Sequence, residues 1–433
     1  MVTRKLEYKG GFQSSEVGLI PSDWKVVKLK EIAERLKAGG TPLRTVKGYW
    51  NGNIPFVKIE DITSVEKYLT RTASTISEEG LRNSSAWLVP PKSILLSMYA
   101  SIGEVAINKV QVATNQAILA IIPKKEVDVE YLYYCLKYHA KRLHSFIVQT
   151  TQKNVNKGIT ENLLVPVPPL AEQRKIAFVL SKIQQAIQQQ DKIIEATKNL
   201  KKSLMQKLFT EGTRGEEQKE TEIGLMPKSW KVLSLSEIVE KTAIIDPRKN
   251  PEIIFKYIDV SSISREYLII NEYKEYKGRD APSRARKAVK EGDIIFATVR
   301  PSLKRIAIIP ESFDGEICST AFCVIRCKKD VALPEFVFYY ILTDGFVKRV
   351  SELQKGTNYP AVTDSDVLAQ KIPLPKISEQ QQIVESLSMV DRKMLAEERR
   401  KVVLQQLFKT TLNKLMTGEI RVKDIDLGVI NVS

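Results

Sequence analysis

The sequence predicts a mixed α/β protein in which two globular domains are joined by two long antiparallel coiled-coil helices. Three observations carry this prediction. Residues 16–26 recur at 222–232, residues 166–173 recur at 373–380, and each copy closes with about 40 residues that lack proline and glycine. Such a repeat indicates a duplicated unit, and antiparallel pairing of the two helices would relate the copies by a pseudo-two-fold axis.

The opening of each copy carries the clearest repeat. Between residues 16 and 32, ten of seventeen positions are identical in the second copy, including the Gly-x-x-Pro-x-x-Trp pattern. Trp24 and Trp230 belong to this pattern. We predict that both tryptophans pack in a core, because they occupy the same place in a repeated domain opening, although an exposed tryptophan could also stack on a nucleic-acid base.

The interior of each copy alternates apolar runs with helical spacing. We predict strands at 54–59, 93–98, 116–122 and 293–298, and helical segments at 129–146 and 334–353. Each copy therefore contains an α/β or α+β domain of about 150 residues, which is large enough to bury its own core.

The second part of each copy is predicted to be one long helix. Proline blocks helix at 166–169 and at 373–375. Ser378 is a plausible N-cap, and Glu172 and Glu379 suit the positive end of the helix dipole. Forty helical residues extend about 60 Å. The expected domains are 1–170, helix 171–214, 215–376, helix 377–418 and tail 419–433.

Apolar residues in both helices follow the alternating steps of three and four that a coiled coil requires. The predicted helix-pairing residues are Ile176, Leu180, Ile183, Ile187, Ile194, Leu204 and Leu208 in the first helix, and Ile383, Leu387, Val390, Met394, Leu404, Phe408 and Leu415 in the second. Polar residues interrupt both seams, and we hypothesise that they set the register. Two alternatives are packing of each helix on its own domain and pairing between two copies of the chain.

The charge of the chain points to a polyanionic partner. Lys and Arg number 67 against 51 Asp and Glu, which gives a net charge of +16. Such a surplus indicates nucleic acid, unless the source proteome is generally rich in lysine. No apolar run reaches the ~20 residues of a membrane span, and no secretory signal is recognisable, so we expect a cytoplasmic protein.

Cysteine and histidine give little support for metal or nucleophilic chemistry. Cys318, Cys323 and Cys327 are close in sequence and could bind a metal as thiolates, but their spacing is not that of a zinc knuckle. We predict that they are buried in a strand. The chain has only two histidines. We therefore expect no metal and no cofactor.

Further motifs in the first copy complete a recognisable set: 38–42 (Ala-Gly-Gly-Thr-Pro), 49–57, 101–103 and Asn115-Gln116. With the duplicated opening and the duplicated helix start, they make the whole chain resemble the specificity subunits of type I restriction–modification systems. The resemblance implies two target recognition domains that each read half of a bipartite site in double-stranded DNA. It also implies an antiparallel helical spacer that docks two methyltransferase subunits, an endonuclease/translocase subunit that joins through that complex, and no catalytic activity of the chain itself.

Residues that could contact DNA are less sharply indicated. Gln and Asn can pair with adenine, and Arg and Lys with guanine or phosphate. The candidates in the first domain are Lys37, Thr41, Arg44, Lys58, Tyr99, Ser101, Gln149, Thr150, Thr151, Gln152, Lys153 and Asn154. Those in the second are Arg248, Lys249, Arg284, Arg286, Arg300, Lys304, Lys355, Thr357, Asn358 and Tyr359. The Gly-Gly-Thr-Pro motif has no counterpart in residues 241–249, so we expect two different half-sites.

Two rival classes of function are an enzyme that acts on DNA and a structural coiled-coil adaptor. A DNA methyltransferase would need an Asn/Asp-Pro-Pro-Tyr/Phe tetrad, and a translocase would need a Gly-x-x-x-x-Gly-Lys-Ser/Thr phosphate loop. Neither occurs in the sequence. A structural coiled-coil adaptor that holds only proteins would not need two large domains or the basic surplus. The sequence therefore favours a DNA-recognition subunit without catalytic residues.

Overall fold

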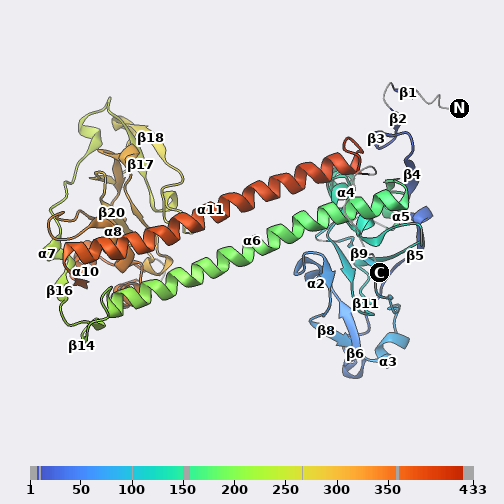
Figure 1. Cartoon of the computed structure of the whole chain (residues 1–433), viewed down its shortest axis with the longest axis horizontal. Helices are drawn as coiled ribbons and strands as arrows, with labels where there is room; N and C mark the ends of the chain where they lie inside the picture. The colour runs from blue at the N-terminus through green and yellow to red at the C-terminus, as the bar shows by residue number, and fades with distance from the viewer. Residues whose placement is uncertain are drawn as a thin grey trace. The chain divides into compact units, whose positions relative to one another are not determined.

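The chain divides into two units by its internal contacts, with residues 1–191 and 400–433 in unit 1 and residues 192–399 in unit 2. The computed structural model describes residues 7–8, 11–99, 101–149, 157–265, 267–356 and 360–422 (Figure 1). Each unit holds one mixed α/β domain and a part of each of two long helices, α6 (Leu170–Glu211) and α11 (Ile377–Met416). The predicted fold class is confirmed.

The domain of unit 1 contains a five-stranded sheet in the order β5-β12-β9-β10-β7 and a three-stranded sheet in the order β11-β6-β8. Their strands are β5 (Ala33–Ala38), β12 (Ile118–Pro123), β9 (Ile94–Ser97), β10 (Val105–Asn108), β7 (Tyr68–Leu69), β11 (Ala113–Thr114), β6 (Trp50–Val57) and β8 (Ser74–Ile76). Two small sheets combine β1 (Glu7–Tyr8), β2 (Phe12–Ser15) and β3 (Gly18–Pro21), and β4 (Lys25–Lys28) with β13 (Leu164–Val167). The helices are α1 (Leu29–Ile32), η1 (Lys47–Tyr49), α2 (Ile59–Thr63), α3 (Glu78–Arg82), α4 (Val129–Gln149) and α5 (Lys157–Glu161).

The domain of unit 2 contains a four-stranded sheet in the order β18-β17-β22-β19 and a three-stranded sheet in the order β21-β20-β23. Their strands are β18 (Lys274–Lys277), β17 (Ile254–Ile258), β22 (Ile317–Ser319), β19 (Ala285–Ala288), β21 (Ile306–Ile308), β20 (Ile294–Ala297) and β23 (Phe322–Ile325). Two pairs combine β14 (Gln218–Thr221) with β15 (Gly224–Pro227), and β16 (Lys231–Ser234) with β24 (Lys371–Leu374). The helices are α7 (Leu235–Ile238), η2 (Pro247–Lys249), η3 (Val260–Ser262), η4 (Gly278–Asp280), η5 (Pro301–Leu303), η6 (Glu311–Phe313), α8 (Pro334–Ile341), α9 (Asp344–Glu352) and α10 (Asp364–Leu368).

The two domains share a topology although their middle sequences differ. In unit 1, β9 lies between β12 and β10, and in unit 2, β20 lies between β23 and β21, with antiparallel pairing throughout. Likewise β6 pairs in parallel with β11 and antiparallel with β8, as β17 does with β22 and β18. The duplication seen in the sequence therefore extends to the central strands of both sheets.

The observed strands confirm the predicted ones, and two details of the helices correct the sequence analysis. The segment predicted as one helix at 334–353 forms two helices, α8 and α9, because the Thr343 side chain accepts a hydrogen bond from Phe346 N and starts a new helix. Ser378 is not the N-cap, because α11 already begins at Ile377. The Lys376 carbonyl instead accepts from the amides of Glu379 and Gln380, as the Pro169 carbonyl accepts from those of Glu172 and Gln173.

Each domain core closes directly on the long helices. In unit 1, Trp24 and α4 residues cluster with Ile176 and Leu180 of α6 and Leu415 of α11. In unit 2, Trp230 and α8 residues cluster with Leu208 of α6 and with Ile383 and Leu387 of α11. Trp24 and Trp230 are 2% and 1% exposed, which confirms their predicted place in the cores. None of the described helices is long and apolar enough to cross a membrane.

A buried glutamine at the start of each long helix joins the helix to its domain. Gln380 accepts from Leu333 N at 2.8 Å and donates to the carbonyl oxygens of Val331 and Pro375 at 3.1 and 3.0 Å. Gln173 makes the equivalent contacts with Asp128 N and with the carbonyls of Glu126 and Pro168. Both side chains are almost fully buried. They satisfy backbone groups that would otherwise be buried without partners.

We expect Gln380→Leu to destabilise the chain by about 2–4 kcal/mol, because one buried and two half-buried backbone groups would lose their hydrogen-bond partner. Denaturant unfolding, monitored by tryptophan fluorescence, measures this loss. Gln381→Leu is the matched control, because the neighbouring Gln381 is exposed and its replacement should change stability little. Equal effects of the two substitutions would contradict the assigned role.

Candidate nucleic-acid interface and helix pair

Gly39 and Gly40 allow their segment of the first domain to lie directly against the backbone at Thr114 and Ser85. A Cβ atom on Gly39 would lie 1.8 Å from the Thr114 carbonyl oxygen, and one on Gly40 would lie 2.6 Å from Ser85 Cβ. Only glycine therefore allows this backbone approach. The result places Thr41 beside Gln116, whose Oε1 accepts a hydrogen bond from the Thr41 hydroxyl at 2.6 Å. Gln116 was not among the predicted contact residues, and the structure places it with them.

A second group lies along β6. Lys58 donates to Ser74 Oγ at 2.7 Å, and its ammonium lies 5.9 Å from the centre of the Trp50 ring. The Trp50 indole donates in turn to the Leu43 carbonyl at 3.3 Å, which ties the 41–48 loop to this strand. Arg44 is exposed on that loop. Thr41, Arg44 and Lys58 thus share one surface of the domain.

The remaining described candidates of the first domain lie elsewhere on it. Lys37 of β5 is half-buried, with its ammonium 5.8 Å from the centre of the Trp87 ring. Tyr99 and Ser101 are half-buried after β9, and the Tyr99 carbonyl accepts from Ser97 Oγ. The side chain of Gln149 and all of Thr150, Thr151, Gln152, Lys153 and Asn154 fall outside the described residues.

In the second domain, several predicted cations pair with acids of the same domain. Arg248 and Arg286 both contact Asp246, and the hydrogen bond from Arg248 is the main reason why the pKa of Asp246 lies well below its usual range. Lys304 donates to Asp344 Oδ1 at 2.6 Å and to the Leu342 carbonyl at 2.9 Å. The charges of these cations are therefore partly neutralised by acidic residues of the same domain.

The other described candidates of the second domain are exposed. Lys249, Arg284, Arg300 and Lys355 all lie on its surface. Arg300 and Lys304 flank η5 with left-handed backbone angles, φ 51° and φ 50°, which non-glycine residues adopt at a cost. Strained backbone of this kind is often found in loops that bind a ligand. Thr357, Asn358 and Tyr359 fall outside the described residues.

The four cysteines are buried, and their thiols are in an environment that disfavours reaction. Their side chains are at most 4% exposed, and burial raises the pKa of Cys135, Cys318 and Cys327 to about 12 and that of Cys323 further. The thiolate is the form that attacks electrophiles and binds metals, so these thiols are unsuited to both roles at neutral pH. No group of side chains that could hold a metal ion occurs among the described residues.

We expect all four thiols to be unreactive toward an aromatic disulfide reagent at pH 8 in the native chain, because protonated, buried thiols do not attack it. Unfolding in guanidinium should release four reactive thiols. The absorbance of the liberated thiolate reports the number. A thiol that reacts quickly in the native chain would show that a cysteine is exposed or activated.

Several of the predicted helix-pairing residues pack into the domain cores, among them Ile176 and Leu180 of α6 and Ile383 and Leu387 of α11. Every residue of both seams is buried or half-buried, including the polar interruptions Gln190 and Thr197, which are 3% and 4% exposed. In unit 1 the Lys401 ammonium lies 2.5 Å from Asp191 Oδ1, and in unit 2 the Lys201 ammonium lies 2.6 Å from Asp391 Oδ1. In each unit, therefore, the two helices lie side by side with opposite directions.

The ends of the helices are joined to the domain openings by a carboxylate. In unit 1 the Glu172 side chain accepts from the Trp24 indole at 3.1 Å and from the Arg421 guanidinium at 2.8 Å. In unit 2 the Glu379 side chain accepts from the Trp230 indole at 3.2 Å and from Thr213 N at 3.1 Å. We call these two clusters the helix joints. Each holds the start of one long helix, the end of the other and the opening of a domain.

Comparison with known proteins adds to this picture. A family model described as the type I restriction modification DNA specificity domain matches the chain twice, at residues 21–198 and 227–406. Each match covers one domain and most of the long helix that follows it.

Two relatives from Methanocaldococcus jannaschii are similar over nearly the full length. The type I restriction enzyme MjaVIII specificity subunit is 28% identical, over 94% of this chain and 95% of that protein. The MjaIX specificity subunit is 29% identical, over 97% and 99%. A crystal structure of the type I restriction–modification S subunit from M. genitalium shares the fold at 16% identity, with a TM-score of 0.54 over 95% of this chain and 98% of that one.

Proposed function

Because this chain belongs to the family of type I restriction–modification DNA specificity domains, we propose that it is the DNA-reading subunit of such a system and carries no catalytic site. Each domain reads one half of an asymmetric bipartite site in double-stranded DNA, and the paired helices set the distance between the halves. The observation that carries this proposal is the double occurrence of the family domain on two domains of the same topology.

The asymmetry of the site follows from the loops. Gly39 and Gly40 place a polar loop with Thr41 and Arg44 against Gln116 in the first domain. The second domain has η2 and its Asp246–Arg248 pair at the corresponding place in the chain. Since base edges are read by individual polar side chains, different loops on a common frame read different sequences.

The affinity for DNA is proposed to come from the basic surplus. A net charge of +16 supplies phosphate contacts without sequence preference, and the polar loop residues supply discrimination between bases. Exposed cations on the second domain, including Lys249 and Arg284, suit phosphate contacts. Binding should therefore weaken steeply as salt concentration rises.

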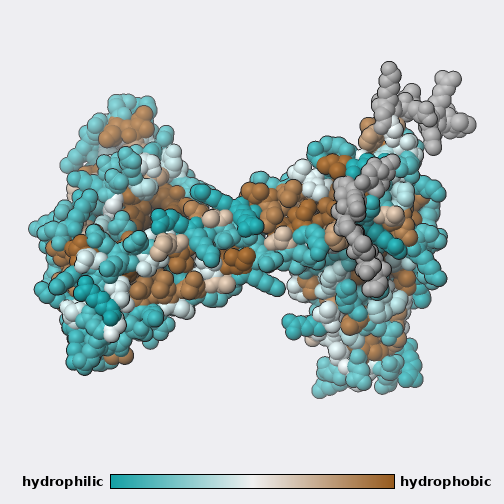
Figure 2. Space-filling model, in the orientation of Figure 1, coloured by the Kyte–Doolittle hydropathy of each residue, from teal (hydrophilic) through white to brown (hydrophobic). Residues whose placement is uncertain are grey.

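The outer faces of the helices are proposed to dock the two methyltransferase subunits, through which the endonuclease/translocase subunit joins. Leu200 of α6 and Leu407 of α11 occupy equivalent positions in the repeat and are 53% and 48% exposed. Val402 and Val403, which like Leu407 belong to α11, are 51% and 61% exposed. Figure 2 shows hydrophobic side chains at the surface of this part of α11. Exposed apolar side chains grouped on a helix are typical of a protein interface.

The proposed function is tested by single-molecule methylome sequencing of cells that carry this chain with the methyltransferase encoded beside it, and of a deletion strain. A split, asymmetric motif with modified adenine in each half should appear only with the chain. If a purified complex forms and no motif appears, the chain is an adaptor that does not read DNA.

We expect insertion of one heptad into both helices, after Asp191 and after Arg400, to lengthen the spacer of the recognised site by about three base pairs. Seven residues add about 10.5 Å of helix, and one base pair spans about 3.4 Å. Both half-site sequences should stay the same. Selection from random duplex DNA gives the motif, and an insertion in one helix alone, which breaks the pairing, should abolish the selection. Altered half-sites with unchanged spacing would contradict the proposal that the paired helices set the distance between the half-sites.

We expect Leu407→Asp to weaken methyltransferase binding about tenfold or more, because a charge would be buried in a docking interface. Leu200→Asp tests the equivalent position. Co-purification and titration of the methyltransferase subunit measure the effect, and Gln406→Asp, at an exposed neighbour, is the matched control. Wild-type binding by both leucine variants would place the docking surface elsewhere.

A further inference from the structure

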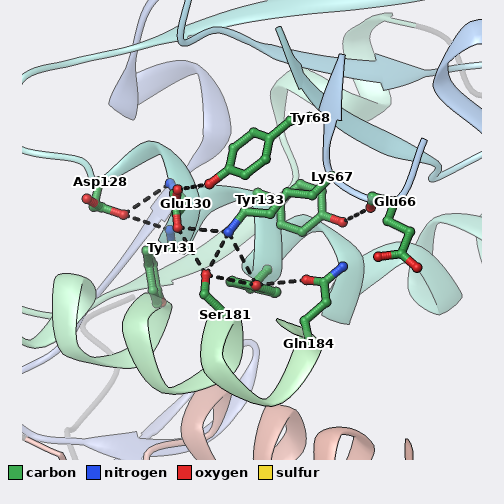
Figure 3. A network of polar contacts seen from close by, with 10 residues as sticks. Glu66, Lys67, Tyr68, Asp128, Glu130, Tyr131, Tyr133, Ser181 and Gln184 are labelled. Atoms are coloured by element: carbon green, nitrogen blue, oxygen red, sulfur yellow. Dashed lines mark hydrogen bonds and ion pairs between the residues drawn. The ribbon is translucent and has the colours of Figure 1, made fainter. Parts of the chain in front are cut away.

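A buried lysine connects the first domain to α6. Lys67, in the loop between α2 and β7, is 6% exposed, and its ammonium has an acceptor for each of its three protons (Figure 3). These acceptors are Glu130 Oε2 at 2.8 Å, Ser181 Oγ at 2.7 Å and the Tyr134 hydroxyl at 3.3 Å. Because Glu130 and Tyr134 belong to α4 and Ser181 belongs to α6, one ammonium holds a loop and two helices together.

The neighbouring contacts leave this cluster fully hydrogen-bonded. The Ser181 hydroxyl donates to Glu130 Oε2 at 3.1 Å, and the Tyr134 hydroxyl donates to Gln184 Oε1 of α6 at 2.8 Å. The Tyr68 hydroxyl donates to the other oxygen of Glu130. Figure 3 shows Glu130 and Ser181 beside the Lys67 ammonium, with the Tyr68 hydroxyl directed at Glu130. A buried polar network that satisfies all its members fixes one arrangement of the elements it joins.

The pKa shifts of Lys67 and Glu130 are those expected of a close, partly buried ion pair. Burial lowers the pKa of the Lys67 ammonium, and the hydrogen bond and charge of Glu130 oppose this shift. Burial would raise the pKa of Glu130, but the hydrogen bonds from Lys67 and Tyr68 outweigh it and lower the pKa. The rings of Tyr68 and Tyr134 lie 5.0 and 4.8 Å from the ammonium and add cation–π attraction.

The backbone next to Lys67 is also attached to the helices. The Glu66 carbonyl accepts from the Tyr133 hydroxyl of α4, and the Glu66 carboxylate accepts from Gln188 of α6. We call Glu66, Lys67 and Tyr68 the latch. It reaches α6 at Ser181 and Gln188, and Tyr134 of α4 reaches Gln184 between them, so that all three contacts follow one face of the helix.

The latch is rigidly connected to the candidate DNA surface of the same domain. Asp61 of α2 is 7% exposed, and its carboxylate accepts from Lys58 N at 2.8 Å and from Ala73 N at 2.9 Å. Lys58 and Ser74, which contact each other, thus lie at the two ends of the segment that contains the latch. The segment that carries the latch is therefore closed at its base by the residues of this surface.

Unit 2 repeats the residues that surround the Lys67 ammonium, but not the lysine itself. Glu335, Tyr339 and Ser388 stand at the positions of Glu130, Tyr134 and Ser181 in the repeat. The Tyr339 hydroxyl donates to Asp391, which stands at the position of Gln184, and the cation over the Tyr339 ring is Lys201 of α6 at 5.3 Å. In the described part of unit 2, the cation beside these residues thus comes from a long helix and not from a domain loop.

We propose that Lys67 is a positioning residue that fixes the orientation of the first recognition domain on α6 and thereby sets how strictly the chain requires one spacer length. The inference rests on the proposed function and adds a specificity determinant far from the bases. A buried charge pair adds little net stability compared with apolar residues of the same shape, but it tolerates only one geometry. The latch thus contributes more to orientation than to stability.

The test uses the full chain in complex with its methyltransferase. Selection from random duplex DNA with the wild-type complex first defines the two half-sites and the spacer. Binding is then measured on duplexes with that spacer and with one base pair more or fewer, a change that turns one half-site by about 35° relative to the other. The variants are Lys67→Met and the double variant Lys67→Met/Glu130→Gln, which leaves no unpaired buried charge. Lys109→Met is the control, because the exposed Lys109 ammonium lies 3.9 Å from the same Tyr68 ring.

The wild-type and Lys109→Met complexes should prefer the selected spacer about tenfold or more, and Lys67→Met should reduce this preference about fivefold. The double variant should regain thermal stability and keep the reduced preference. If the preference of the double variant returns with its stability, or if Lys67→Met keeps the wild-type preference, the latch has only a structural role and the proposal is wrong. If Lys67→Met does not fold, Glu130→Gln alone takes its place with the same expected loss. A wild-type complex that selects no bipartite site would instead overturn the proposed function.

Discussion

The arrangement of this protein depends on one buried carboxylate at the start of each long helix. Glu172 and Glu379 are 2% and 3% exposed, and each accepts the indole N–H of the tryptophan that opens its domain. A buried carboxylate is costly unless donors surround it. In unit 1 Arg421 supplies the opposite charge, and in unit 2 the backbone and hydroxyl of Thr213 supply the donors. The requirement for donors forces helix start, helix end and domain opening into one place.

The sequence predicted the parts of the fold that depend on local pattern. Strand positions, the long helices and the buried tryptophans follow from periodicity and from the repeat, because each is set by which side chains need burial. The break between α8 and α9 was missed, since Thr343 competes with the helix through a single side-chain hydrogen bond. Ser378 was misplaced because a carbonyl, not a hydroxyl, receives the first amides of α11.

The candidate site was less predictable for a physical reason. Gln116 joins Thr41, and Lys67 joins Ser181, through contacts between residues far apart in the chain, which no local pattern records. Charge and residue type selected Arg286 and Lys304 as candidates for DNA contact, but the acids that pair with them, Asp246 and Asp344, lie 40 residues away along the chain. The two domains show the converse: the same topology carries different loops, because core packing constrains strands and leaves surface side chains free to vary.

The two helix joints are built alike, although the chain runs on through only one of them. Gly212 after α6 and Gly418 after α11 both adopt left-handed backbone, and both lie against the proline and tryptophan of a domain opening. At one joint the chain runs on from helix to domain, and at the other the segment up to Val422 docks on residues near the start of the sequence. The same contacts form with and without a covalent link. A circular permutant that is cut after Gly212 and linked across the other joint is therefore expected to keep this architecture.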